Sequence, residues 1–331
     1  MPPALTDAVN DYLKGRLDTD LALAVKTGRP EAVTKALAIV KDDKAPGEKR
    51  ASVLQAMADA ANTEAVPVLL GILAKSTGTG LKKAALSSAV KFEDARLAKA
   101  VLDGYESHFA GDPALKDAAH RMLASRKEWA RMFVGEVDKW HIKAADVAPD
   151  IVRQLALYKE PELDALIAKH WKSMEKKLSS AQKLAEAKRI RTVLGGGAGT
   201  VEKGRALFTQ RCALCHMLFN EGGKIGPELT GYERTNLDFW LTATLDPSIE
   251  IREGFGAYVL KLKDGQTMTG IIEKQDASGI ALRDLAGQRH TARADNIESL
   301  EGSPISLMPE GMMACLSDAE LRDLFAFLTK P

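Results

Sequence analysis

The five residues Cys212-Ala213-Leu214-Cys215-His216 decide more about the fold and chemistry of this 331-residue chain than any other stretch. Two thiols separated by two residues can both reach one edge of a porphyrin and form thioether bonds to its vinyl groups. The histidine that follows directly can then supply an axial nitrogen to the iron. The Cys-x-x-Cys-His spacing therefore predicts covalent attachment of a haem at this point of the chain.

Two other chemistries use a Cys-x-x-Cys pair. A zinc site takes four ligands, usually including a second such pair, but the only other cysteine of the chain is Cys315. A redox-active dithiol begins a helix in a β-α-β pattern, and no such pattern surrounds Cys212. Zinc and dithiol chemistry are the alternatives to haem, and Cys315 is expected to be a buried, inert thiol.

Length and composition indicate an ordinary globular protein of two or three domains, with 45% apolar and 27% charged residues. No stretch approaches the roughly 20 apolar residues of a membrane span. Residues 1–200 carry 32 Lys and Arg against 26 Asp and Glu, whereas residues 201–331 carry 14 against 19. This asymmetry favours charged faces for docking to a protein partner, and it is too small to indicate nucleic acid.

The predicted haem also bears on the cellular compartment. In bacteria the apparatus that attaches haem to such a motif works outside the cytoplasmic membrane. The residues Met1-Pro2-Pro3-Ala4 show no basic segment followed by an apolar one. We therefore expect a periplasmic protein whose export signal has been removed or belongs to a longer chain.

Residues 1–194 are predicted to be helical throughout, because Ala, Leu and Val recur every three to four residues. The segments beginning at Lys49, Lys82 and Lys116 are weakly similar, with offsets of 33 and 34 residues. A helix pair that repeats at this period predicts an α-solenoid and resembles degenerate HEAT repeats; an irregular helical bundle is the alternative. The glycine-rich residues 195–199 predict a flexible linker.

The helical part offers no metal-binding spacing. Its tryptophans and histidines are expected to be packing aromatics and surface imidazoles; they include Trp129, Trp140, Trp171, His120, His141 and His170. The lysine-rich residues 172–188, with Lys176, Lys177 and Lys183, predict a solvated helix face.

Residues 200–331 combine helices with a β segment. A helix over 201–208 leads into the haem motif, and a Ser317–Glu320 capping box opens a terminal helix. Between them, over residues 254–300, apolar and polar residues alternate with a period of two, as in β-strands, and Asp264-Gly265 is typical of a hairpin turn. Five short strands in so few residues predict a small barrel resembling SH3-like or Sm-like folds. Its ends should lie close together, because the haem domain must close around it.

Residues 200–331 resemble the class I cytochrome c domain, in the haem-binding type recognised in planctomycete and verrucomicrobial proteins. The residues that carry the resemblance are Gly204-Arg205-Ala206-Leu207-Phe208, Cys212 to His216, Gly226-Pro227-Glu228-Leu229-Thr230-Gly231, Leu245-Asp246-Pro247-Ser248, Leu262-Lys263-Asp264-Gly265 and Met308-Pro309-Glu310-Gly311. In that family helical repeats often precede the haem domain. The expected fold is thus mainly α, an N-terminal HEAT-like solenoid followed by a cytochrome c domain with the small β-barrel inserted.

The resemblance implies roles for particular residues. Met308 corresponds to the distal iron ligand, and the carbonyl of Pro227 to the acceptor of the Nδ1 proton of the ligating His216. Such an acceptor fixes the imidazole tautomer, and a thioether favours reduced iron. Met312 is the alternative ligand, and His290 or an open distal site is a further one. Gly204, Phe208 and Phe327 are expected to pack where the first and last helices of the domain cross.

A His/Met iron has no open coordination position, so the sequence favours an electron carrier with a single covalent haem c rather than an enzyme. The implied partner is a redox protein, such as an exported dehydrogenase. The alternatives are a peroxidase-like haem enzyme with an open or labile distal site, and a redox tail attached to a scaffold protein. No catalytic residues, nucleic acid or membrane span are expected.

Overall fold

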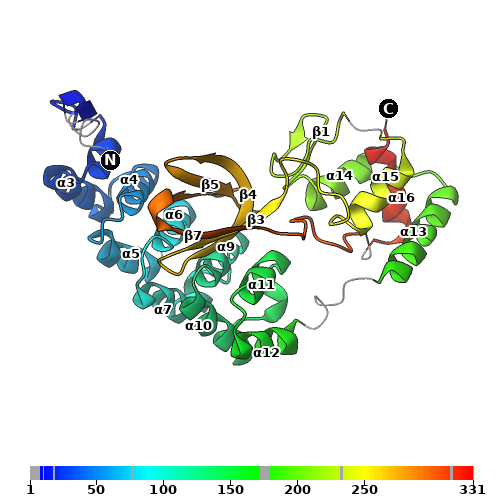
Figure 1. Ribbon diagram of the computed structural model, residues 1–331, viewed down its shortest axis with the longest axis horizontal. Helices are drawn as coiled ribbons and strands as arrows, with labels where there is room; N and C mark the ends of the chain where they lie inside the picture. Colours follow the sequence, from blue (N-terminus) through cyan, green and yellow to red (C-terminus); the bar gives the residue numbers. More distant parts are fainter. Residues whose placement is uncertain are drawn as a thin grey trace. The chain divides into compact units, whose positions relative to one another are not determined.

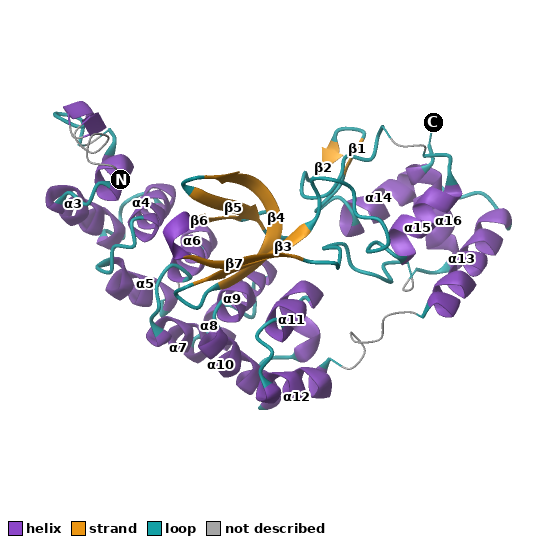
Figure 2. Cartoon of the chain, viewed as in Figure 1, coloured by secondary structure: helices purple, strands orange, loops and turns teal. Residues whose placement is uncertain are grey.

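The computed structural model describes residues 8–9, 11–17, 19–75, 78–171, 179–231, 234–313 and 316–330. The chain forms two compact units, residues 1–170 and 171–331 (Figure 1). Helices predominate, with one five-stranded sheet and one short hairpin (Figure 2), which confirms the expectation of a mainly α protein. Among the helices of these described ranges, none has the length and apolar character that crossing a bilayer requires.

The first unit is helical, and several of its helices begin at a proline or behind a capping aspartate. Proline opens α3, α9 and α11, where its missing N–H costs nothing. Asp94 and Asp112 accept backbone hydrogen bonds at the starts of α7 and α9. The helices are α2 (Leu21–Lys26), α3 (Pro30–Lys41), α4 (Gly47–Asp59), α5 (Ala65–Leu73), α6 (Thr79–Ala89), α7 (Ala95–Asp103), α8 (Tyr105–His108), α9 (Pro113–Ala124), α10 (Lys127–Asp138), the 3-10 helix η1 (Ala144–Asp146), α11 (Pro149–Ala156) and α12 (Pro161–His170).

These helices contact one another in two rows. Helices α4, α6, α9 and α11 contact in succession, as do α3, α5, α7, α10 and α12. The repeat noticed in the sequence falls on α4, α6 and α9, where Val53, Leu86 and His120 are all buried. A hydrogen bond of 3.0 Å joins Thr79 Oγ1 at the start of α6 to Asp112 at the start of α9. A regular HEAT-type solenoid stays a prediction.

His120 differs from the surface imidazole that was expected. It is fully buried, with Nε2 2.7 Å from Tyr105 Oη and its ring against those of Tyr105 and Phe133. Burial lowers the pKa of His120 to about 4, so the ring is neutral at pH 7. The packing role holds for Trp129, which is buried, but not for Trp140, which is exposed.

The second unit begins earlier than the sequence suggested. The helix α13 (Ser180–Gly195) contacts α15 (Leu237–Leu245) and α16 (Asp318–Leu328), and it buries Ile190 and Val193 in their core. The unit boundary therefore lies between His170 and Trp171 rather than at residue 194, because these two apolar side chains tie α13 to α15 and α16.

The same core explains residues 195–199. A Cβ on Gly199 would lie 2.0 Å from the carbonyl O of Arg322, and the N–H of Thr200 donates to Asp323 at 2.6 Å. The end of this run is packed against α16, which a free linker would not be.

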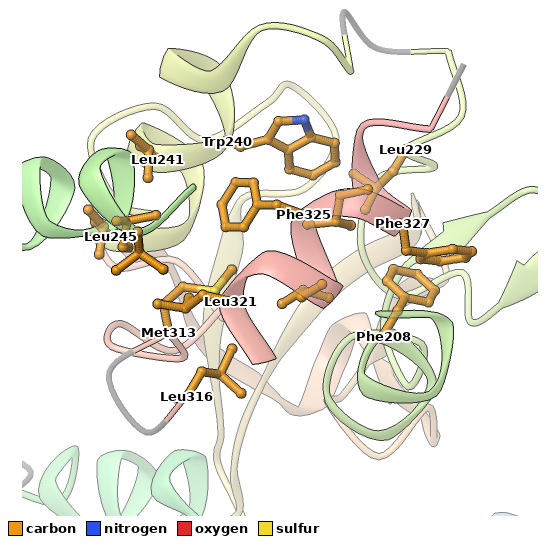
Figure 3. Packing of buried hydrophobic residues seen from close by; sticks show 14 of the residues in the cluster. Phe208, Leu229, Trp240, Leu241, Leu245, Met313, Leu316, Leu321, Phe325 and Phe327 are labelled. Carbon is orange, nitrogen blue, oxygen red and sulfur yellow. The ribbon is translucent and has the colours of Figure 1, made fainter. Parts of the chain in front are cut away.

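Helix α14 (Val201–Arg211) crosses α16, as expected. A Cβ on Gly204 would lie 1.9 Å from the carbonyl O of Asp323, so only glycine allows the two backbones to approach this closely. The rings of Phe208 and Phe327 pack beside this contact with centroids 5.5 Å apart (Figure 3). The predicted capping box of Ser317 and Glu320 opens α16.

The β insertion forms one antiparallel sheet of order β6-β5-β4-β3-β7. The Asp264-Gly265 hairpin is confirmed, since it joins β3 to β4. The ends of the insertion are adjacent as predicted, because Tyr258 pairs with Gly302 and the N–H of Ser303 donates to Ala257. Strands β6 and β7 are the edges of this order, and closure into a barrel stays a prediction. The elements are β3 (Ala257–Leu262), β4 (Thr267–Asp276), β5 (Gly279–Arg283), β6 (Arg289–Arg293), the 3-10 helix η2 (Ala294–Asn296) and β7 (Ile297–Gly302).

Candidate haem site

The Cys-x-x-Cys-His motif forms a tight turn at the end of α14. The N–H of Cys212 donates to Phe208 O at 2.8 Å, and those of Cys215 and His216 donate to Cys212 O at 3.1 and 2.9 Å. Residues three apart in such a turn lie on the same side of the chain, which brings the two thiols to one side. Both cysteines are half-buried.

A second segment folds back over this turn. Its backbone N–H groups donate to the carbonyls of the motif and of the residue after it: Gly223 to Ala213 at 2.7 Å, Gly226 to Cys215 at 2.8 Å and Leu229 to Met217 at 2.8 Å. The hairpin of β1 (Met217–Leu218) and β2 (Glu221–Gly222) makes the connection. Backbone hydrogen bonds within the turn and from the second segment fix the backbone of the motif. The Cα–Cβ bonds of Cys212, Cys215 and His216 therefore have fixed directions.

His216 is oriented by its neighbours in this second segment. Nδ1 lies 2.9 Å from the carbonyl O of Pro227, the atom to which the cytochrome c resemblance assigns it. A carbonyl can only accept, so Nδ1 carries the proton and Nε2 keeps the lone pair that a metal needs. Burial lowers the pKa of His216, and the bond to Pro227 only partly opposes this. The imidazole is therefore neutral, as an iron ligand must be.

Gly226 provides a cradle for the same ring. A Cβ at this position would lie 2.6 Å from Cε1 and 2.8 Å from Nδ1 of His216, so any side chain would push the imidazole away. Gly226 is part of the segment that carries the cytochrome c resemblance. Its contact with the His216 ring explains why this position is a glycine. The donor set and the cradle together fit a haem attached through Cys212 and Cys215, with Nε2 of His216 as axial ligand.

The alternatives to haem fit less well. Burial raises the pKa of the Cys212 thiol to about 11, whereas redox-active dithiols have lowered thiol pKa values. Within the described ranges, no group of three or more His, Cys, Asp and Glu side chains is placed to hold a metal ion. Cys315 lies outside the described residues.

The methionine segment follows β7. The N–H of Met308 donates to Ser306 Oγ at 3.2 Å, and the N–H of Ser306 donates to Ser248 Oγ at 3.1 Å. Met308 and Met312 are half-buried, whereas Met313 is 3% exposed and packs in the core (Figure 3). Nε2 of His290, on β6, is 2.8 Å from Oδ2 of Asp284 in the turn between β5 and β6. Met308 and Met312, the two candidate iron ligands, thus keep thioether groups that the core does not fully enclose.

One residue near this segment was assigned wrongly from the sequence. Lys183 on α13 does not lie on a solvated face: its side chain is 16% exposed, and Nζ contacts Asp246 at 2.8 Å and Glu310 at 3.4 Å. The spacing of charges in the sequence could have indicated this pairing. Lys183 and Arg191 are separated by the same number of residues as their partners Asp246 and Asp238. Lys176 and Lys177 lie outside the described residues.

Residues 201–282 match the family model described as Cytochrome c. The match covers α14, the Cys-x-x-Cys-His motif, Pro227 and α15, and it ends within β5. Met308 and α16 lie beyond it, although α16 packs against α14. The family binds haem c covalently, so the chain carries a c-type cytochrome domain with haem c as its cofactor.

Proposed function

We propose that the chain is a mono-haem c-type electron carrier whose iron is held by His216 and Met308. The observation that carries this proposal is the hydrogen bond of His216 Nδ1 to the carbonyl of Pro227, with Gly226 against the ring. When bound, haem c supplies one-electron redox chemistry through its iron. The family is in general one of electron carriers, and the chain contains one Cys-x-x-Cys-His motif.

The surrounding residues suit electron transfer because they resist movement. Backbone hydrogen bonds fix the turn that bears His216, and the Ser248–Ser306–Met308 chain of hydrogen bonds supports the methionine segment. Two protein ligands that stay in place leave no coordination position for a substrate. They also keep the reorganisation between oxidation states small.

We further propose that the protein works in the periplasm and accepts electrons from an exported dehydrogenase. Support comes from the attachment chemistry and from the charge of residues 201–331, 14 basic against 19 acidic side chains. An acidic haem domain favours a basic docking surface on the partner, with association slowing as salt increases. In this proposal residues 1–170 form a HEAT-like solenoid that serves as a scaffold for such a partner.

Ligand binding by the wild-type holoprotein tests the carrier proposal. A six-coordinate His/Met iron should bind carbon monoxide or cyanide slowly and show little turnover of hydrogen peroxide. Reversible one-electron voltammetry should give a potential higher than that of a bis-histidine haem. Rapid binding of either ligand, together with peroxide turnover, would instead support a haem enzyme with an open distal site.

A further inference from the structure

Lys183 connects two segments of the haem domain that are separated in sequence by the whole β insertion. Its Nζ lies 2.8 Å from Asp246 Oδ1, just after α15, and 3.4 Å from Glu310 Oε1, two residues after Met308. The three side chains are 16%, 30% and 19% exposed. Helix α13, which bears Lys183, lies outside the residues that match the Cytochrome c family.

Lys183 is held in place by its own helix. The capping box of Ser179 and Gln182 fixes the first turn of α13, where Lys183 lies. Two turns further on, Arg191 pairs with Asp238 at the start of α15. Since Lys183 pairs at the end of α15 and Arg191 at its start, the two helices run antiparallel. The ammonium group is therefore presented to Glu310 by a helix anchored at both ends.

Glu310 depends on this cation. Its Oε2 is buried and has no hydrogen-bond partner in the described part of the chain, while Oε1 faces Lys183. A carboxylate shielded from water in this way must be balanced by a nearby charge. Without Lys183, the carboxylate of Glu310 would be stabilised by turning toward solvent, where water can hydrate its charge. Pro309 has a fixed φ, so the backbone between Met308 and Glu310 has one dihedral fewer with which to absorb that movement.

We propose that Lys183 is a positioning residue that holds the Met308 segment against the haem domain by bridging Asp246 and Glu310. The inference rests on the proposed function, in which Met308 is the distal ligand. The hydrogen bond from the N–H of Ser306 to Ser248 Oγ holds the segment two residues before Met308. Glu310 holds it two residues after Met308. Lys183 thus controls how firmly the thioether stays on the iron, although α13 itself carries no ligand.

Substitution of Lys183 in the full-length holoprotein tests this role. Lys183→Met keeps most of the aliphatic chain and removes the charge, and Lys183→Arg restores the charge. Lys188→Met is the matched control, because Lys188 is an exposed lysine of the same helix. The measurements are the methionine-to-iron charge-transfer band of the ferric protein and the rate of cyanide binding. We expect Lys183→Met to weaken the band and to speed cyanide binding up to about fivefold, Lys183→Arg to recover most of the loss, and Lys188→Met to behave as wild type.

The outcomes separate this inference from the function on which it rests. A wild-type protein without the band contradicts the His/Met proposal. A wild-type band that Lys183→Met leaves unchanged, with an unchanged cyanide rate, overturns the role of Lys183. If Lys183→Met folds poorly, the double variant with Glu310→Gln decides: removing both charges should restore folding if the pair is real, and equal damage in single and double variants would refute it.

Discussion

Replacing Gly226 by alanine should disturb the ligand histidine through a single methyl group. The new Cβ would lie 2.6 Å from Cε1 of His216, whereas ordinary contacts begin at 3.4 Å. The ring or the loop must therefore separate by the difference of 3.4 − 2.6, which is 0.8 Å. The hydrogen bond from Nδ1 to Pro227 is already 2.9 Å long, and such bonds weaken beyond about 3.2 Å.

The size of the effect follows from these two changes. Overpacking of a tight contact costs about 1–3 kcal/mol, and loss of a hydrogen bond costs about 0.5–1.5 kcal/mol. Gly226→Ala should thus lower the free energy of unfolding of the haem domain by roughly 2–4 kcal/mol. The reduction potential should rise, because an imidazole without its acceptor is less basic and stabilises ferric iron less.

Urea unfolding of the holoprotein, followed at the haem absorption band, measures the stability change, and voltammetry measures the potential. Gly231→Ala is the control, since it lies in the same loop and a Cβ there has no atom within 4 Å. Neither glycine has a positive φ, so the two substitutions differ in packing alone. Equal stability and equal potential in the two variants would refute the account of the His216 site.

Three further predictions concern attachment, pH and the insertion. Haem staining after denaturing electrophoresis should show colour on the wild-type polypeptide and none on Cys212→Ser/Cys215→Ser; a variant that keeps the colour contradicts attachment at these thiols. The pKa of His120 is about 4 in the folded chain against an ordinary 6.5, so the unfolded state takes up the proton first as pH falls. The free energy of unfolding should therefore decline by roughly 3 kcal/mol between pH 6.5 and 4, and urea titrations should find this slope missing in His120→Gln; an identical slope in both proteins would count against the buried neutral ring. Deleting 257–302 and bridging the adjacent ends should preserve the haem spectrum, and a folded deletion without haem ligation would show that the insertion builds the pocket.

Local patterns allowed much of the fold to be predicted. The Asp264-Gly265 hairpin and the Ser317–Glu320 capping box each depend on a few neighbouring residues, and both are present. The crossing at Gly204 was also predicted, because the cytochrome c resemblance brings the first and last helices of the domain together. The structure supplies the reason for a glycine there, because a Cβ on residue 204 would lie only 1.9 Å from the carbonyl O of Asp323.

Features that depend on distant segments were missed. Lys183 looks like any surface lysine until α13, the end of α15 and the Met308 segment are packed together. His120 looks equally suited to the surface, and its burial follows only from Tyr105 and Phe133 closing over the ring. The unit boundary was misplaced for the same reason, since the apolar residues of α13 do not reveal which neighbour they pack against.

The identity of the distal ligand is the central claim, and one spectroscopic comparison tests it most directly. The ferric wild-type protein should show the methionine-to-iron charge-transfer band. Met308→Ala should abolish this band and open the iron to cyanide, while Met312→Ala should leave both properties unchanged. Retention of the band in Met308→Ala, its loss in Met312→Ala, or its absence from the wild-type protein would contradict the His216/Met308 electron carrier.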